Sequence, residues 1–395
     1  MRQTVPALQA ELFFSRPPRY KGGAMKVCMD IQAALGQRAG VGRYVRELLA
    51  HLGAAAGADE LAAFYFDFKR AGLDAPPPGV EMRACRWLPG RVAQAAWKRL
   101  GFPPYEWLAG PADLYHFPNF IRPPLGRGRK SVVTIHDVSF LRMPETTEAR
   151  NLAWLSAEIH ATADKADAIL TDSRFSAREI VELLRVPEEK VFPVWLGLPE
   201  FGPPPAPEAA AAARRALGVD KPYLLMVGTL EPRKNIPFLV KIYEALRDFD
   251  GDLVLVGGLG WKTGPILRAI SESPRKAGIK LLKHLDDTQL SALYAGASAF
   301  TFPTRYEGFG FPPLEAMGRG APVVAARNSS LPEVLGDAAE WVAGYDAEAW
   351  AATIRAVLAD SARAARLRAA GFEQARKFTW EETARQTWEV YRRLG

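Results

Sequence analysis

Residues 305–325, RYEGFGFPPLEAMGRGAPVVA, carry the signal that decides the fold. The run ASAFTFPT before them reads as a short buried strand. Pro312 and Pro313 stand where a helix can begin, since proline lacks only an N–H that would be unpaired there. We therefore expect Glu307 on a strand-to-helix loop and Glu315 in the first helical turn. Free backbone N–H groups at a helix start attract phosphate, and two carboxylates beside them could bind hydroxyl groups on either side of a diphosphate.

Strand and helix patterns alternate along the chain, which predicts parallel sheets covered by helices. A proline-rich run at 203–207 separates two similar halves and indicates a stiff, extended linker. We therefore predict an α/β fold with two doubly wound Rossmann-like domains, which bind ligands beyond the carboxyl ends of their strands. The strands are expected at 25–31, 62–68, 113–118, 131–137, 168–173 and 190–197 in the first half, and at 222–228, 252–258, 280–285, 299–304 and 321–326 in the second.

Composition narrows the class of protein. The 395 residues, 48% hydrophobic and 24% charged, suffice for two domains of a globular protein. A net charge of +7 is too small for this length to indicate a dedicated nucleic-acid binder, and it suits an enzyme that handles diphosphates. No apolar run reaches the roughly 20 residues that span a bilayer. Cys28 and Cys85 have no metal or redox spacing and favour a reducing cytoplasm.

Four segments resemble, in order, the retaining glycosyltransferases of family 4, which have the GT-B architecture. Besides 305–325, they are DIQAALGQRAGVGRYVRELL (30–49), VVTIHDVSFLRMPE (132–145) and LLMVGTLEPRKNI (224–236). The resemblance covers about residues 25–395, nearly the whole chain. One such segment would be weak evidence, whereas four segments in the family's order and at its spacing are specific.

The resemblance implies a domain organisation. Two Rossmann-like domains face a cleft, the first on the acceptor side and the second holding the nucleotide sugar, and the last helix crosses back to the first domain. The N-terminus lacks the apolar core of a signal peptide and is expected to be a disordered leader, which leaves Met1 and Met25 as alternative starts of translation. The expected boundaries are 1–24 for the leader, 25–200 for the N-terminal domain, 201–218 for the linker region, 219–378 for the C-terminal donor-binding domain and 379–395 for the last helix.

The resemblance also assigns roles to the two glutamates and to a basic loop. Glu307 is expected to contact the transferred sugar, and Glu315 the ribose hydroxyls. Lys234 stands where the family places a lysine that binds the diphosphate, and cations there would stabilise charge on the leaving phosphate. Thr229 stands where the family commonly has an arginine. Arg233 is the candidate to replace it, since a planar guanidinium suits phosphate oxygens, and a solvated loop cation is the alternative.

Glycine loops and strand ends complete the expected donor site. Gly40 and Gly42 precede a helix and would let a ligand approach the backbone, although a simple turn is the commoner reason for such a pair. The other donor-binding candidates are Gly228, Thr229, Gly257, His284, Leu285, Gly308, Phe309, Gly310 and Phe311.

Polar residues also follow two strands of the first half. His136 matches a family histidine that contacts the donor sugar, and a hydrogen-bonded structural histidine is the alternative. Asp137 could receive the proton of the acceptor as the new bond forms. His116 and Asn119, in LYHFPNF, end the preceding strand and are expected on the acceptor side. The catalytic candidates are thus Glu307, His136, Asp137, Lys234 and Arg233.

These assignments give a hypothesis for the reaction. A hexose is transferred with retention, mannose from GDP-mannose being the first choice, to a saccharide or lipid-linked saccharide acceptor in polysaccharide assembly. The partners are a nucleotide sugar and a carbohydrate, with no nucleic acid. The alternatives are a UDP-sugar-dependent glucosyl- or N-acetylglucosaminyltransferase, a GT-B epimerase, and a catalytically silent nucleotide-sugar-binding scaffold, which only Thr229 favours.

No cofactor besides the donor substrate is expected, and no metal. Asp248 and Asp250 form an Asp-x-Asp pair, which binds metal in the other large glycosyltransferase architecture. The pair lies in a turn between a helix and a strand, where aspartate and glycine are favoured as turn formers. This is the wrong end of the strand for the expected site, so metal-independent transfer is the hypothesis.

Residues 86–108, RWLPGRVAQAAWKRLGFPPYEWL, mix lysine and arginine with three tryptophans. A basic amphipathic segment with tryptophan can lie in a membrane interface, and a lipid-linked acceptor would make such contact useful. A helix packed on its own domain is the alternative. The expected location is the cytoplasm, with peripheral contact to the anionic inner face of the plasma membrane as an option.

Overall fold

The computed structural model describes residues 23–36, 40–70, 72, 76–198 and 206–395. Residues 1–22 of the predicted leader and 201–205 of the predicted linker lie outside these ranges. The chain divides into two compact units, Met1–Pro118 with Pro123–Val132 and Ala384–Gly395, and Asn119–Arg122 with Val133–Thr383. No helix among the described residues is long and apolar enough to cross a membrane. Cys28 and Cys85 are free and buried.

The first sheet has seven strands in the order β3-β2-β1-β4-β5-β6-β7. Six of them correspond to predicted strands, and β3 was missed. The pairs β1–β2, β1–β4, β2–β3 and β6–β7 are parallel. The strands are β1 Lys26–Asp30, β2 Glu60–Phe66, β3 Val80–Cys85, β4 Leu114–Phe117, β5 Lys130–Thr134, β6 Ala168–Thr171 and β7 Val191–Pro193.

The second sheet has six parallel strands in the order β10-β9-β8-β11-β12-β13. Its order reverses between β8 and β11, the place where doubly wound sheets bind ligands beyond the strand ends. The prediction of two parallel, doubly wound sheets is confirmed. The strands are β8 Tyr223–Val227, β9 Asp252–Val256, β10 Ile279–Leu282, β11 Ala299–Phe302, β12 Val323–Ala326 and β13 Ala339–Val342.

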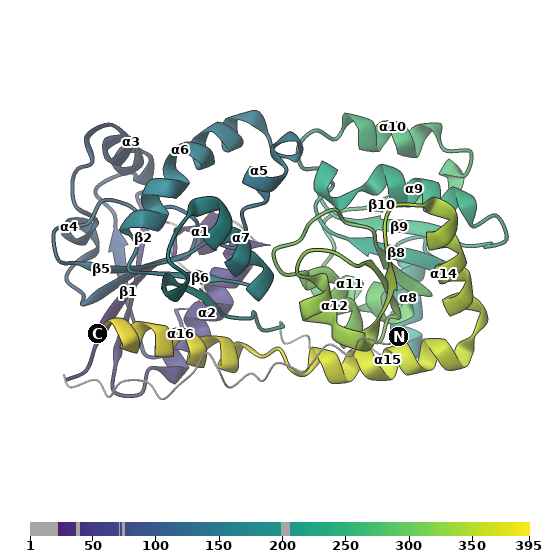
Figure 1. Ribbon diagram of the computed structural model, residues 1–395. Helices are drawn as coiled ribbons and strands as arrows, with labels where there is room; N and C mark the ends of the chain where they lie inside the picture. Colours follow the sequence, from purple (N-terminus) through teal and green to yellow (C-terminus); the bar gives the residue numbers. More distant parts are fainter. Residues whose placement is uncertain (1–22, 37–39, 71, 73–75, 199–205) are drawn as a thin grey trace, which may run out of the picture. The chain divides into compact units, whose positions relative to one another are not determined.

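Helices cover both faces of the second sheet, where α9 packs on α10 and α14, α8 packs on α11, and α12 packs on α15 (Figure 1). The helices of the first half are α1 Gln32–Gly36, α2 Val41–Ala55, α3 Gly90–Leu100, α4 Tyr105–Ala109, α5 Ser139–Arg142, α6 Ala149–Lys165 and α7 Arg174–Leu184. Those that follow are α8 Pro207–Ala216, α9 Ile236–Ala245, α10 Gly264–Glu272, α11 Asp287–Gly296, α12 Phe311–Gly318, α13 Leu331–Leu335, α14 Ala347–Ala359, α15 Ser361–Ala375 and α16 Trp380–Leu394.

The last helix, α16, is fixed to the first sheet and its helices through buried aromatic side chains. The indole N–H of Trp388 donates to the carbonyl of Leu52 in α2 at 3.0 Å. The hydroxyl of Tyr391 lies 2.6 Å from Nδ1 of His116, a buried residue of β4 that pairs in register with Met29 of β1. The chain end from Ala384 onward therefore belongs to the same compact unit as residues 1–118.

Replacing Trp388 with phenylalanine should lower the free energy of unfolding by about 1–3 kcal/mol, because a buried hydrogen bond and part of a buried ring are lost. Urea unfolding followed by circular dichroism measures the change. The matched control is Trp87→Phe, since Trp87 is 71% exposed and its replacement should cost less than about 0.5 kcal/mol. Equal stabilities of the two variants would contradict the role given to Trp388.

Candidate active site

The candidate site lies at the carboxyl edge of the second sheet, where its strand order reverses. Lys234 ends a short 3₁₀ turn, Pro232–Lys234, which follows β8. Glu307 lies in the loop between β11 and α12. Because β8 and β11 are neighbours in the sheet, their following loops meet at one place.

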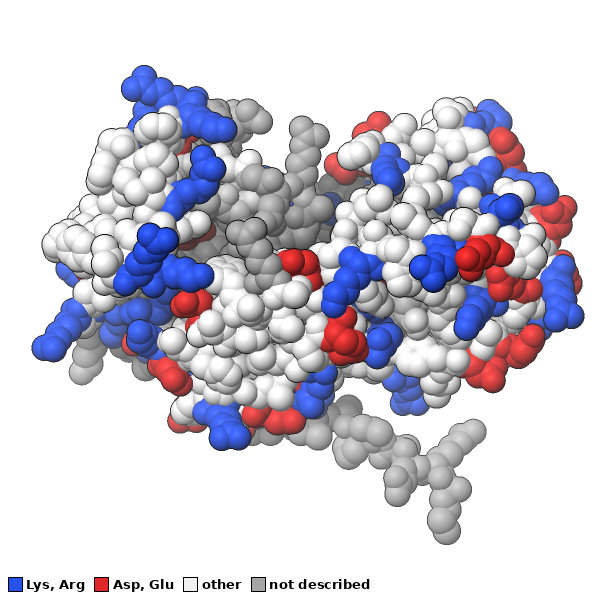
Figure 2. All heavy atoms as spheres, turned by 90° about the horizontal axis from the view of Figure 1, so that it is seen from above, with Lys and Arg blue, Asp and Glu red and all other residues white. Residues whose placement is uncertain are grey.

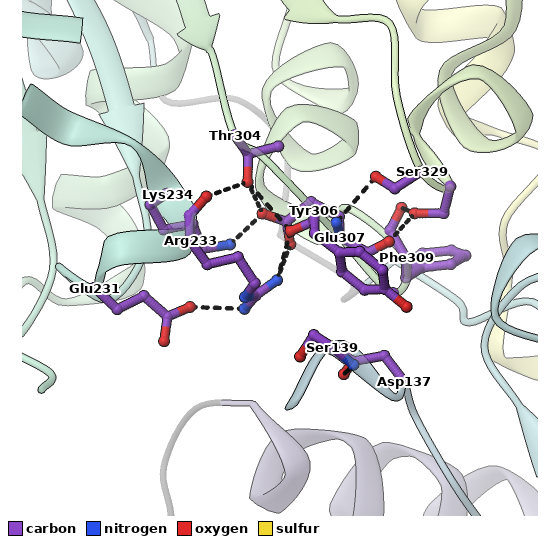
Figure 3. A network of polar contacts seen from close by, with 12 residues as sticks. Asp137, Ser139, Glu231, Arg233, Lys234, Thr304, Tyr306, Glu307, Phe309 and Ser329 are labelled. Carbon is purple, nitrogen blue, oxygen red and sulfur yellow. Dashed lines mark hydrogen bonds and ion pairs between the residues drawn. The ribbon is translucent and has the colours of Figure 1, made fainter. Parts of the chain in front are cut away.

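The carboxylate of Glu307 forms ion pairs with two basic side chains. Its Oε1 lies 2.7 Å from Nζ of Lys234, and its Oε2 lies 3.1 Å from a guanidinium nitrogen of Arg233 (Figure 3). Arg233 also pairs with Glu231 at 2.7 Å, and the hydroxyl of Thr304 donates to Glu307 at 2.7 Å. The acidic loop and the basic loop that the sequence places in one site are therefore in direct contact.

The charged side chains of this cluster are largely shielded from water, and the acidic and basic groups pair with one another. Burial raises the pKa of Glu307, but Lys234 and Arg233 outweigh this effect and hold the pKa below its ordinary value. Burial lowers the pKa of Arg233, while Glu307 and Glu231 raise it above its usual range. Burial lowers the pKa of Lys234, although Glu307 acts in the opposite direction. Two carboxylates thus lie beside two basic side chains in this cluster.

Two glycines at this edge have positive φ angles that favour glycine, and at one of them packing also excludes a side chain. Gly228 and Gly257 follow β8 and β9 with φ of 148° and 153°. A Cβ on Gly257 would lie 2.1 Å from the carbonyl oxygen of Gly228, so no side chain fits there. The exposed Thr229 and the exposed His284, which follows β10, lie at the same edge, with Leu285 half-buried beside them.

The loop that carries Glu307 is fixed on both sides by serine side chains. Ser330 donates to the carbonyl of Glu307 at 2.9 Å, and the hydroxyl of Ser329 accepts from its N–H at 3.0 Å. The carbonyl of Gly308 accepts from Ser173 at 2.6 Å. A Cβ on Gly308 would lie 2.8 Å from Cβ of Asp137, so glycine is needed here as well. Side-chain hydrogen bonds and close packing therefore both restrain this loop.

Glu315 lies one turn further into the helix than expected. Helix α12 begins at Phe311, directly after Gly310, whose φ of 107° ends the loop. Glu315 is therefore in the second turn, and the prediction of the first turn is wrong. Its carboxylate is buried and accepts a hydrogen bond from the hydroxyl of Tyr294 at 2.8 Å. The expected contact with a ribose stays a prediction.

His136 is held by a carboxylate that the sequence analysis missed. Its Nδ1 lies 3.0 and 3.1 Å from the two carboxylate oxygens of Asp172, which follows β6. Burial raises the pKa of Asp172, although His136 acts in the opposite direction. The carboxylate of Asp137 accepts from the N–H of Ser139 at 2.9 Å and so closes its own loop.

The remaining candidates fall into two groups. His116 has 0% of its surface exposed and belongs to the core, and its expected place on the acceptor side stays a prediction. Asn119 is exposed and stays a candidate. Gly40, with φ of 58°, precedes α2 and Gly42 is buried within it. Both belong to the first compact unit, so their donor contacts remain predictions.

No metal site forms from the described residues: they contain no group of three or more His, Cys, Asp or Glu side chains that could hold an ion. Asp248 pairs with Arg355 at 2.9 Å, and Asp250 pairs with Lys221 at 2.7 Å. The two aspartates thus have separate basic partners at the turn before β9. Metal independence itself stays a prediction.

The model of the family "Glycosyl transferases group 1" matches residues 210–374. The chain is 35% identical over 285 residues to the O-antigen chain mannosyltransferase B of Escherichia coli. The matched region covers 71% of this chain and 74% of that protein. It is 30% identical over 243 residues to the serotype-specific mannosyltransferase WbdA of Escherichia coli, covering 59% of this chain and 30% of that protein. A solved sucrose-phosphate synthase from Thermosynechococcus elongatus superposes with a TM-score of 0.70 at 21% identity, covering 94% of this chain and 99% of that one. The chain therefore belongs to the group 1 glycosyltransferases and has the GT-B architecture, the family that its four sequence segments resemble.

Proposed function

We propose that this glycosyltransferase moves a hexose, with retention of configuration, from a nucleotide diphosphate sugar to a saccharide or lipid-linked saccharide in polysaccharide assembly. Mannose from GDP-mannose is the first choice, supported by the 35% identity to an O-antigen mannosyltransferase. The observation that carries the proposal is the contact of Glu307 with Lys234 and Arg233 at the carboxyl edge of the second sheet. A cytoplasmic location is part of the proposal.

The proposed chemistry needs no protein nucleophile. The bond between C1 of the hexose and the leaving phosphate oxygen breaks while the acceptor oxygen bonds to C1 on the same face. The acceptor proton passes to the leaving phosphate oxygen. Lys234 and Arg233 would stabilise the charge that develops on that phosphate, since preorganised cations act most strongly in a site shielded from water. A covalent glycosyl-enzyme trapped on any carboxylate would contradict this route.

Donor binding would replace ion pairs within the protein by contacts to the donor. Both cations are paired with Glu307. A diphosphate competes for these cations and leaves Glu307 free to accept hydrogen bonds from sugar hydroxyls. The role is thus orientation of the sugar.

A thermal-shift panel with GDP-, UDP-, ADP- and dTDP-sugars tests the donor class, since selective binding stabilises the folded protein. We expect GDP-mannose to raise Tm most. A larger shift with UDP-glucose or UDP-N-acetylglucosamine would contradict the choice of mannose in favour of a UDP-sugar transferase. Release of nucleotide diphosphate with and without acceptor then separates transfer from epimerisation and from binding alone.

Excess chelator should leave transfer essentially unchanged, because the proposed cations are side chains. Residual activity below about a tenth would indicate a required divalent ion, since metal-assisted steps depend on the ion's charge.

Asp172→Asn should lower transfer by roughly tenfold, because the ring of His136 loses the partner that fixes its orientation. The pH–rate profile should change shape, which a merely structural defect would not cause. Glu179→Gln is a matched control, since Glu179 is a buried carboxylate that pairs with Arg142 at 2.6 Å instead. Equal rates for both variants would remove Asp172 from the site.

A further inference from the structure

The surface around α3 and α4 concentrates exposed apolar side chains. Among the described residues, every large apolar side chain with at least 50% of its surface exposed lies within 68–107. Monomeric proteins rarely leave such clusters uncovered unless the cluster binds something. The side chains are Phe68 at 55%, Trp87 at 71%, Val92 at 53%, Leu100 at 75%, Phe102 at 50% and Trp107 at 67%.

The fold brings these side chains to one region. Phe66 and Cys85 are partners in the parallel pair of β2 and β3, so the segments that follow these strands leave the same sheet edge. Phe68 and Trp87 lie in those two segments. Beyond α3, the rings of Phe102 and Trp107 meet edge to face at 5.2 Å. We call this set of six apolar side chains, with the basic residues among them, the α3–α4 surface.

Helix α3 already has its packing partners. Ala93 is 1% exposed, and the indole N–H of Trp97 donates to the carbonyl of Pro103 at 2.8 Å. The ring of Trp97 also meets Phe66 and Tyr105, with centroids 5.9 and 5.8 Å apart. Packing on its own unit therefore uses Ala93 and Trp97 and leaves the α3–α4 surface outside.

The charge of this surface is mainly basic. Residues 86–105 contain Arg86, Arg91, Lys98 and Arg99 and no acidic residue. Two acidic side chains lie beside them: Asp67, which pairs with Arg86 at 3.5 Å, and the half-buried Glu106, which accepts from the N–H of Gly126 at 2.9 Å. All four basic side chains are exposed. Figure 2 shows blue basic side chains among white uncharged ones, with a few red acidic side chains, over its left part, on the side where α3 lies in Figure 1. Cations beside exposed tryptophans match a bilayer interface, where rings enter the headgroup region and cations meet anionic lipid.

We propose that the α3–α4 surface docks on an anionic phospholipid bilayer. The inference deepens the proposed function, since a lipid-linked acceptor would be met at that bilayer, but docking itself requires no turnover. Charge complementarity selects lipid over a neutral partner, and the spread of aromatic side chains over loops and helix ends suits a broad, fluid surface.

Co-sedimentation of the full chain with vesicles tests this. Binding to phosphatidylcholine containing about one third phosphatidylglycerol should exceed binding to phosphatidylcholine alone at least tenfold and should weaken with salt. Lys98→Glu/Arg99→Glu and Trp87→Ser/Trp107→Ser should each reduce binding about tenfold or more. The matched controls, Lys241→Glu/Arg366→Glu and Trp154→Ser, alter exposed residues elsewhere and should bind like the parent.

Several outcomes would overturn the proposal. The first is that the parent protein does not bind the anionic vesicles, and the second is that the control variants lose as much vesicle binding as the surface variants. The third is self-association without lipid that Trp87→Ser/Trp107→Ser abolishes, which would mark the surface as a contact between two copies of the chain. The surface variants should also transfer sugar to a water-soluble acceptor as well as the parent does. Loss of that activity would assign the surface to the acceptor. Vesicle binding without any transferase activity would instead refute the proposed function and leave the docking surface standing.

Discussion

Glu307→Gln should lower the rate of hexose transfer by about 10²–10³-fold, the range found when one preorganised polar group is removed from a transition-state site. The substitution keeps the shape of the side chain but removes the charge that pairs with Lys234 and Arg233. It therefore weakens both the orientation of the sugar and the placement of the two cations. Acceptor-dependent release of nucleotide diphosphate measures the effect.

The matched control is Glu231→Gln. Glu231 is as buried as Glu307, and its ion pair is with Arg233. Glu231→Gln should reduce the rate of hexose transfer by less than about a tenth of the factor expected for Glu307→Gln, since Lys234 and the loop that carries Glu307 keep their partners. A Glu307→Gln enzyme within threefold of the parent would show that Glu307 has no part in transfer.

The stability of the Glu307→Gln variant should also depend on pH differently from that of the parent. The pKa of Glu307 is held below its ordinary value in the folded protein. Its stabilising effect is therefore fully present above the unfolded pKa of about 4.3 and is lost as the pH falls through the folded value. The difference in Tm between parent and Glu307→Gln should be largest at neutral pH and shrink on acidification.

Lys234→Met should reduce transfer by at least about a hundredfold and weaken donor binding, because the buried cation nearest to Glu307 disappears while the side-chain length is kept. Calorimetric titration with GDP-mannose and steady-state kinetics measure the two effects. Lys280→Met is the control, since Lys280 pairs with Asp252 at 3.3 Å and lines a separate cavity of about 460 Å³. Equal affinity and rate for Lys234→Met and the parent would exclude the lysine from the donor site.

The meeting of Glu307 and Lys234 could be predicted from sequence because each residue follows a strongly apolar strand. Carboxyl ends of neighbouring parallel strands share one edge, and the order of strand and helix patterns sets which edge that is. The glycines at 257 and 308 follow the same logic, since they lie after these strands and the backbone or Asp137 occupies the space of a side chain.

The missed strands lie at the edges of the two sheets. β3 contains Glu81 and Arg83 and has one fully buried residue, and β13 is half-buried in its middle. Edge strands need no continuous apolar run, so their patterns resemble loops. Periodicity alone could not separate them from the connections around them.

Residues that support the site were missed for a different reason. Asp172 lies 36 residues after His136, and Ser329 lies 22 residues after Glu307. Such partners come from separate loops, and no local spacing rule links them. The burial of His116 likewise depends on Tyr391, which is 275 residues away and reaches it through α16.

A crystal structure of the protein soaked with intact GDP-mannose tests the central claim most directly. The expected result is a diphosphate within hydrogen-bonding distance of Lys234 or Arg233, with the hexose against Glu307. A donor bound elsewhere, for example in the cavity lined by Lys221, Arg275 and Lys280, with the ion pairs of Glu307 unchanged, would contradict the account.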